Sequence, residues 1–458
     1  MRIAWFTPFG PRSAIGDYSE TIVRRLAVED EVTVFAPAGD GADAPRPFPL
    51  PVVPIPPVPP VEVLEQLCGF DLAVYNLGNH LHNHLSAYET AVRRPGVVVL
   101  HDLVLRDFFR GYFLLHRKDP AGFARFLRYA HGPEAEAHGR DVVEGRRHED
   151  YDDPARLRFP LFKPALHRAL GVVVHSEYAR GRVAAEVPAP VRMIDFPRFG
   201  PTADAAPPRF RHPGGKVQVL TFGVLVPNKL VHAVVEAIAG SELLRRSVRY
   251  TAVGAEGMQG YEGRLRKRID AHGLGEVVTL AGRLSDDELR AALDGADVVV
   301  NLRNPHCGES SASLLTSLVA GVPTVVWDHG FYAEFPDDVV VKVRSEAEIA
   351  GALERLAGDP GLRQRIGRTA RAHALARFDT DRYCRQFREF AGHVRALAPV
   401  LALADTASDR LAELGSTDLD RLADRFAAEI AALVPEVPAA FRVTPPPADV
   451  APGRRAAA

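Results

Sequence analysis

The sequence predicts an α/β protein made of two doubly wound domains that face a central cleft. Short, apolar, β-branched runs alternate with helical segments in the first part of the chain, and the alternation starts again near residue 216. Runs that are apolar on both faces are typical of buried parallel strands. A chain of 458 residues is also too long for one ordinary core. Because such sheets bind ligands beyond the carboxyl ends of their strands, we expect the site in the cleft.

The first domain is predicted over residues 1–197. Its expected strands are Ile3–Thr7, Glu31–Ala36, Leu72–Leu77, Gly96–His101, Leu170–His175 and Val191–Ile194. A helix is expected over Tyr18–Ala27, and the proline-dense segment Ala44–Pro60 is expected to be an extended surface connection. A charge-rich helical insertion is predicted over about 103–150.

The second domain is predicted over residues 216–380, after a linker over 198–215. Its expected strands are Val217–Phe222, Tyr250–Val253, Val277–Ala281, Asp297–Leu302 and Thr324–Trp327. A helical extension is expected over 381–434, and the remaining residues, 435–458, are expected to be disordered.

Composition narrows the class of protein. Apolar residues make up 47% and charged residues 25% of the chain, as in globular proteins, and a net charge of −2 gives no general reason to bind nucleic acid. The three cysteines are too widely spaced for a disulfide framework or a thiolate metal site. Without a signal peptide or a bilayer-spanning run, the cytoplasm is the expected compartment. Composition leaves open contact of one lobe with a membrane, and it does not indicate an oligomeric state.

The most informative stretch is residues 301–323. An apolar strand ends in a polar loop, and a helix is expected to open with Glu309, Ser310 and Ser311. The first N–H groups of a helix lack internal partners, and the helix dipole adds positive charge there, so this start favours a phosphate. An ordinary capped helix would show the same pattern, and the segment alone does not decide between the two.

Five local motifs give the chain a family resemblance over about residues 1–395. They are Thr7-Pro8 with Gly16-Asp17-Tyr18-Ser19; Leu77-Gly78-Asn79 with His84, Tyr88 and Val99-Leu100-His101-Asp102; Phe222-Gly223 with Lys229; residues 301–311; and residues 330–336. In this order the motifs resemble those of the GT-B glycosyltransferases, whose two domains are Rossmann-like. More narrowly, they resemble the retaining, nucleotide-sugar-dependent transferases of family four.

Two departures make this a divergent branch. Val224 stands where the family has an arginine directly after the phosphate-loop glycine. The family's pair of glutamates is also missing: Gly308 and Thr316 occupy those positions, and Glu309 is displaced by one. We expect Arg303 to supply the cation that Val224 cannot.

The resemblance assigns roles to nine residues. The expected catalytic residues are His101, Asp102 and Glu309, and the expected donor-binding residues are Gly16, Gly223, Lys229, Arg303, Ser310 and Ser311. Lys229 and the serine amides would bind the leaving phosphate, and Gly16 would let the first loop fold over the donor. His101 would position and polarise rather than attack. No metal and no cofactor are expected, since a nucleoside diphosphate sugar is the donor substrate.

Each of these residues also has an ordinary structural explanation. Lys229 fits an exposed helix start, Gly16 a turn and His101 a hydrogen-bonded strand end, while Glu309 could simply cap its helix. Two apparent metal motifs, residues 150–152 and the alternating histidines at 80, 82 and 84, are interpreted as a charged loop and as ordinary histidines.

Three functions are compatible with the pattern. The first is sugar transfer to an unidentified acceptor with retention of configuration. The second is nucleotide-sugar epimerisation, which needs paired acid and base groups rather than an acceptor groove. The third is a non-catalytic scaffold that has kept the fold. The insertion favours an acceptor surface, and therefore transfer.

Overall fold

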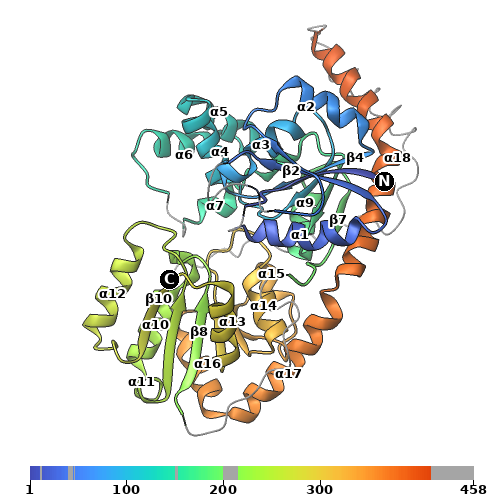
Figure 1. Cartoon of the computed structure of the whole chain (residues 1–458). Coiled ribbons are helices and arrows are strands. Elements are labelled where there is room, and N and C mark those ends of the chain that lie inside the picture. Colours follow the sequence, from blue (N-terminus) through green and yellow to red (C-terminus); the bar gives the residue numbers. More distant parts are fainter. Residues whose placement is uncertain (11–12, 40–44, 46, 150–152, 200–214, 414–458) are drawn as a thin grey trace.

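The computed structural model describes residues 1–458 except 11–12, 40–44, 46, 150–152, 200–214 and 414–458. Two parallel sheets form two lobes, one above the other in Figure 1, with helices on both faces of each sheet. The predicted class, two doubly wound α/β domains, is confirmed. The predicted linker over 198–215 and the tail over 435–458 lie almost entirely outside the described residues.

The first sheet contains seven parallel strands in the order β3-β2-β1-β4-β5-β6-β7. Their bounds are β1 Arg2–Phe6, β2 Glu31–Pro37, β3 Val52–Ile55, β4 Leu72–Leu77, β5 Val97–Leu100, β6 Gly171–Val174 and β7 Val191–Met193. The expectation of a plain connection over Ala44–Pro60 was wrong, because β3 lies within it and pairs with β2. Strand β3 can contain Pro54 because it is an edge strand. On its unpaired side, the N–H that proline lacks is not needed for a hydrogen bond to another strand.

The second sheet contains six parallel strands in the order β10-β9-β8-β11-β12-β13. Their bounds are β8 Val217–Phe222, β9 Val248–Val253, β10 Val278–Gly282, β11 Val298–Asn301, β12 Thr324–Trp327 and β13 Val341–Val343. Strand β13 was not predicted. Strand β13 has only three residues, too few for a recognisable sequence pattern, and it is defined by its pairing with β12.

Helices cover both sheets. In the first lobe they are α1 Ala14–Leu26, α2 Val61–Gln66, η2 Leu67–Gly69, α3 Leu81–Ala91, α4 Arg106–Gly111, η3 Tyr112–His116, α5 Pro120–His131, α6 Pro133–Val143, α7 Ala155–Arg158, α8 Phe162–Leu166 and α9 Glu177–Ala184. In the second part they are η4 Pro227–Lys229, α10 Val231–Gly240, α11 Glu242–Ser247, α12 Tyr261–Ala271, α13 Asp286–Gly295, α14 Ala312–Ala320, α15 Gly330–Ala333, α16 Ala347–Gly358, α17 Pro360–Arg377 and α18 Thr380–Glu413. No helix of the described residues is long and apolar enough to cross a lipid bilayer.

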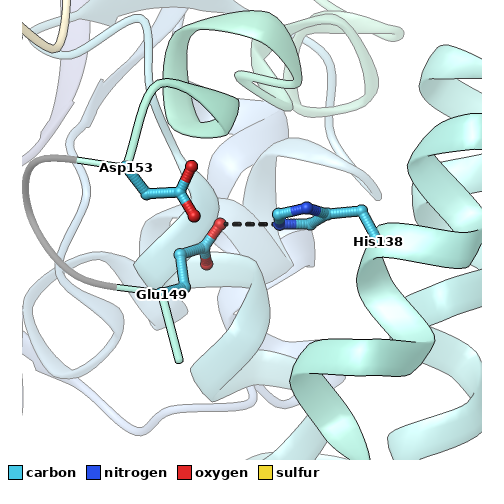
Figure 2. Close-up of side chains that lie close together, drawn as sticks. All are labelled: His138, Glu149 and Asp153. Carbon is cyan, nitrogen blue, oxygen red and sulfur yellow. Dashed lines mark hydrogen bonds and ion pairs between the residues drawn. The ribbon is translucent and has the colours of Figure 1, made fainter. Parts of the chain in front are cut away.

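The segment between β5 and β6 folds into a helical layer with a buried charged centre (Figure 2). Glu149 Oε1 lies 2.6 Å from a terminal nitrogen of Arg106 and 3.2 Å from His138 Nε2. The Arg106 and Glu149 side chains are both fully buried. Because each charge has its counter-charge, burial is tolerated, and the network joins α4 and α6 to the segment that contains Glu149.

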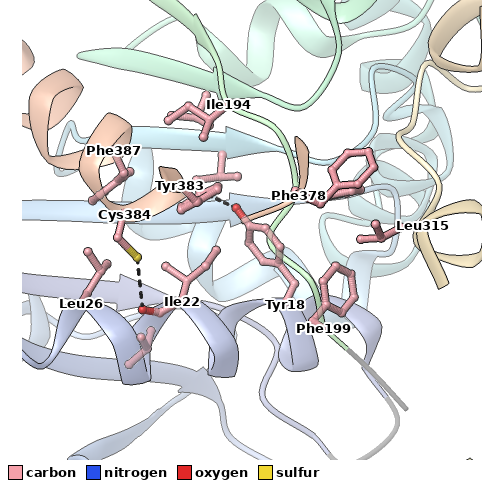
Figure 3. Packing of buried hydrophobic residues seen from close by; sticks show 14 of the residues in the cluster. Tyr18, Ile22, Leu26, Ile194, Phe199, Leu315, Phe378, Tyr383, Cys384 and Phe387 are labelled. Carbon is pink, nitrogen blue, oxygen red and sulfur yellow. Dashed lines mark hydrogen bonds between the residues drawn. The ribbon is translucent and has the colours of Figure 1, made fainter. Parts of the chain in front are cut away.

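Helix α18 leaves the second lobe and packs along the first (Figure 1). The Tyr383 hydroxyl lies 2.5 Å from the hydroxyl of Tyr18 on α1 (Figure 3). The ring of Phe387 meets the Trp5 ring edge to face, with 5.6 Å between centroids. Arg388 of α18 donates to Asp30 at 2.7 Å. The four aromatic side chains belong to one apolar cluster that also includes Leu315 of α14 in the second lobe. The helix therefore holds the two lobes together.

We predict that Phe387→Ala lowers the free energy of unfolding by about 3–5 kcal/mol, because truncating a buried aromatic removes its contacts and leaves a cavity. Leu403→Ala, on the same helix but 49% exposed, is the matched control and should change stability by less than about 0.5 kcal/mol. Urea unfolding followed by circular dichroism measures both. Equal stability of the two variants would show that α18 is not anchored through this face.

Candidate active site

The two lobes meet where loops after β5 and β11 come into contact. The Val104 N–H donates to the Cys307 carbonyl at 3.0 Å. Leu103 packs against Gly308 so closely that a Cβ on Gly308 would lie 2.5 Å from the leucine side chain, and the φ of Gly308 is +74°. Glycine is needed there for both conformation and space. This contact brings Asp102, from the first lobe, beside the loop that carries Arg303 and Glu309.

His101 is buried and takes one tautomer. Its Nε2 lies 3.0 Å from Asn76 Oδ1, and the Asn76 amide nitrogen donates to the Phe6 carbonyl at 2.9 Å. Because Asn76 therefore presents its oxygen, His101 Nε2 carries the proton and Nδ1 is the acceptor. Burial, followed by the neighbouring His175 and His84, holds the pKa of His101 well below its usual value. His101 is thus a neutral hydrogen-bonding group, packed 5.0 Å from the Tyr18 ring.

Asp102 follows His101 and is half-buried. Its Oδ2 accepts the Asn79 N–H at 2.9 Å. Burial, and then the negative charge of Glu309, raise the pKa of Asp102 to about 6. Two carboxylates from opposite lobes therefore lie within electrostatic range of each other.

Asn79 is a site residue to which sequence reasoning gave no role. Its side-chain oxygen accepts the N–H groups of Asp107 and Phe108 at 2.9 and 3.1 Å, and its amide nitrogen donates to Asp107 Oδ2 at 2.8 Å. Asn79 therefore ties the start of the insertion to Asp102. Its place after a strand-end glycine was the available signal, but its partners are distant in sequence.

Lys229 lies at the carboxyl end of β8 and is buried. Its Nζ donates to the Phe222 carbonyl at 3.1 Å and rests against Gly223, where a Cβ would lie 2.4 Å from Nζ. Burial, and then the positive charge of Arg303, lower the pKa of Lys229 to about 7, opposed by Glu309. The alternative explanation of Lys229 as an exposed lysine at a helix start is excluded.

Val224, which occupies the position of the family's arginine, is 54% exposed.

Arg303 and Glu309 form an ion pair in the loop after β11. Arg303 Nε lies 2.9 Å from Glu309 Oε1, and Glu309 Oε2 accepts the Cys307 N–H at 2.6 Å. Burial is the largest single influence and disfavours the charged guanidinium, but Glu309 together with Tyr332 and Cys307 outweighs it and raises the pKa of Arg303. The structure thus brings Asp102, Lys229, Arg303 and Glu309 into one electrostatic group.

The helix after this loop starts later than predicted. Helix α14 begins at Ala312, with Ser311 as its N-cap, whereas Glu309 and Ser310 lie in the preceding loop. Ser311 Oγ accepts the Leu314 N–H at 3.1 Å and a bond from Asn301 at 3.2 Å. The capping side chain stops the helix from extending toward Glu309, because it satisfies an N–H that a further turn would satisfy.

Gly16 does not lie in a loop. Helix α1 begins at Ala14, four residues before the predicted start, and Gly16 is in its first turn with its N–H bonded to Ser13 Oγ at 3.0 Å. The neighbouring Ile15 approaches Gly78 beside Asp102. The start of α1 therefore faces the site, while Gly16 itself has helical surroundings.

His138, Glu149 and Asp153 are close enough to be considered as metal ligands, with one ligand atom each within 4.8 Å of the others (Figure 2). Glu149 is already paired with Arg106, and Asp153 with Arg147 at 3.0 Å. A divalent cation would have to displace two guanidinium groups, so these residues fit an ion-pair network better than a metal site. The Asp-x-Asp pattern at 150–152 lies outside the described residues.

Comparison with known proteins gives the same fold. Residues 203–373 match the family described as Glycosyl transferases group 1. A D-inositol 3-phosphate glycosyltransferase of Streptomyces bingchenggensis (strain BCW-1) is 29% identical over 202 residues, which span 43% of this chain and 42% of that relative.

Solved structures extend the similarity to both lobes. Sucrose-phosphate synthase from Thermosynechococcus elongatus superposes with a TM-score of 0.58 at 16% identity, over 86% of this chain and 99% of that one. Anabaena HepE in complex with UDP-glucose gives a TM-score of 0.57 at 17% identity, again over 86% and 99%. At these identities the likeness establishes the GT-B fold.

We predict that Gly223→Ala destabilises the protein by about 1–3 kcal/mol, because the glycine has a φ of +103° and its new Cβ would collide with Lys229 Nζ. Gly263→Ala, in α12 with open space around it, is the control and should be neutral or stabilising by about 0.5–1 kcal/mol. Thermal and urea unfolding measure both changes. A Gly223→Ala protein as stable as the control would contradict the close approach of Lys229.

Proposed function

We propose that this protein transfers a sugar from a nucleoside diphosphate sugar to an acceptor, with retention of anomeric configuration and without a metal. The observation that carries the proposal is the convergence of two cations, the buried Lys229 and the largely buried Arg303, at the carboxyl ends of β8 and β11. Each positive charge disfavours the other, and Glu309 offsets this only in part. The diphosphate of a sugar donor would be a stronger anionic partner for both.

The reaction places opposite demands on the two sides of the cleft. As the bond between the anomeric carbon and the diphosphate breaks, negative charge develops on the leaving phosphate, which Lys229 and Arg303 stabilise. The acceptor oxygen forms the new bond on the same face, and its proton passes to the leaving phosphate oxygen. His101, neutral with Nδ1 as acceptor, suits a sugar hydroxyl rather than nucleophilic attack. Asp102, on the side of the first lobe, would orient an acceptor hydroxyl.

The similarity to a D-inositol 3-phosphate glycosyltransferase supports sugar transfer, although less than half of each chain is matched. The fold neighbour HepE was solved with UDP-glucose, which supports a nucleotide-sugar donor. The cysteines at 68, 307 and 384 are free, which supports a reducing compartment such as the cytoplasm.

A thermal-shift screen of nucleotides and nucleotide sugars, with Mg²⁺ and with EDTA, tests this proposal. A ligand of the folded state raises the melting temperature. Stabilisation by one nucleoside diphosphate, unchanged in EDTA, is the expected result, and the best donor is then incubated with candidate acceptors. The anomeric configuration of the product is read by NMR. An inverted product would refute retention, and no response to any nucleotide would refute the donor.

We predict that Lys229→Ala and Arg303→Ala each weaken nucleotide-sugar binding by about 2–5 kcal/mol, because each removes a buried partner of the diphosphate. Lys216→Ala, which removes an exposed lysine just before β8, is the control and should bind normally. Isothermal titration measures the three affinities. Normal binding by Arg303→Ala would refute the idea that Arg303 replaces the arginine missing at Val224.

We predict that nucleotide-sugar affinity falls as pH rises above about 7. The folded-state pKa of Lys229 is lowered from 10.5 to about 7, so the free protein loses this charge above neutrality, while a bound diphosphate favours the charged form. The affinity should therefore approach a tenfold loss per pH unit, until the pH reaches the raised pKa of the complex.

A nucleotide sugar is the right probe, since its diphosphate does not titrate in this range. The Lys216→Ala control should show the same slope as the unmodified protein. A flat profile between pH 7 and 9 in both proteins would contradict a titrating Lys229.

A further inference from the structure

The carboxylate of Glu309 is the anion that lies beside the two cations of the proposed phosphate site. It pairs with Arg303 Nε at 2.9 Å and accepts the Cys307 N–H at 2.6 Å. The side chains of Arg303 and Glu309 are only 19% and 12% exposed. Glu309 also acts electrostatically on Lys229 and on Asp102. One protein carboxylate thus sits among all the charged groups of the site.

The contact between Arg303 and Glu309 is close but poorly directed. Arg303 Nε and Glu309 Oε1 are both buried atoms without a hydrogen bond of good geometry in the described part of the chain. The fully buried Tyr332 hydroxyl lies beside Arg303 and Ser311. A matched guanidinium–carboxylate fork would make two parallel bonds. This pair is held by charge, and its polar atoms keep unused hydrogen-bonding capacity.

A diphosphate that approaches Arg303 from the side of Nε would meet this carboxylate. Phosphate oxygens and the Glu309 oxygens would be like charges competing for the same donors in a poorly solvated site, where repulsion is strong. Gly308, at a φ of +74°, precedes Glu309 and gives the backbone conformations that other residues rarely adopt. Because Gly308 is packed against Leu103, the carboxylate would leave Arg303 by rotation about the side-chain bonds of Glu309.

We infer that Glu309 is an internal counter-ion that occupies the phosphate position and is displaced by the diphosphate of the donor. This inference rests on the proposed function in taking Lys229 and Arg303 as the phosphate-binding cations. Glu309 keeps two buried cations compatible with a folded site, and it sets the affinity for any anion that replaces it. Once displaced, the Glu309 carboxylate is free to accept hydrogen bonds from hydroxyl groups of the sugar.

Pyrophosphate is the test ligand, because it has neither base nor sugar. Glu309→Gln removes the competing charge and keeps the size of the side chain, so pyrophosphate should bind about tenfold more tightly, equivalent to about 1.4 kcal/mol. Glu276→Gln, an exposed residue between α12 and β10, is the control for the change in net charge and should bind as the unmodified protein does. Titration calorimetry gives the three affinities.

Equal or weaker binding of pyrophosphate by Glu309→Gln would overturn the inference. If that variant fails to fold, a crystal structure of the unmodified protein with pyrophosphate decides. We expect the anion to lie between Lys229 and Arg303, with Glu309 no longer paired with Arg303, and an intact pair would overturn the inference. The nucleotide screen separates the two proposals: a protein that binds pyrophosphate as described but no nucleotide would refute the donor assignment alone.

Discussion

The apolar cluster shared by both lobes is the constraint on which the site depends. Ile22 of α1, Leu315 of α14 and Phe387 of α18 belong to it, although they are distant in sequence. Burying this surface fixes the position of one lobe relative to the other and places the loop after β5 against the loop after β11. The hydrogen bond from the Val104 N–H to the Cys307 carbonyl depends on that placement. The charged groups of the cleft meet because apolar side chains elsewhere are buried together.

Charge balance then determines what the cleft can hold. Lys229 and Arg303 would destabilise a buried site as a bare pair, and Glu309 offsets them. Asp102 adds a second carboxylate from the other lobe, whose pKa rises because burial and Glu309 both disfavour its charge. Asn79 connects the start of the insertion to Asp102, because its backbone N–H bonds to Asp102 and its side chain bonds to Asp107.

Predictions from sequence succeeded for elements that the local sequence determines. Strands such as β4 and β8 are short runs of apolar residues buried on both faces, a pattern typical of parallel strands. Predictions failed for elements that exist only because a neighbouring strand pairs with them. Strand β3 contains Pro54 and exists because β2 offers an edge, and β13 exists because β12 does. Helix α1 begins at Ala14 because Ser13 caps it.

The sequence alone determined two parallel α/β sheets, their strand-end loops, and the residue types that gather there, because buried strands and glycine loops are encoded over a few residues. The tertiary structure alone decided which of those residues meet. Lys229 against Gly223 and Arg303 with Glu309 are contacts within single loops, but Asp102 faces Glu309 from the other lobe, across more than 200 residues of chain. No local pattern records such distances, because charge interactions act through space and not along the chain.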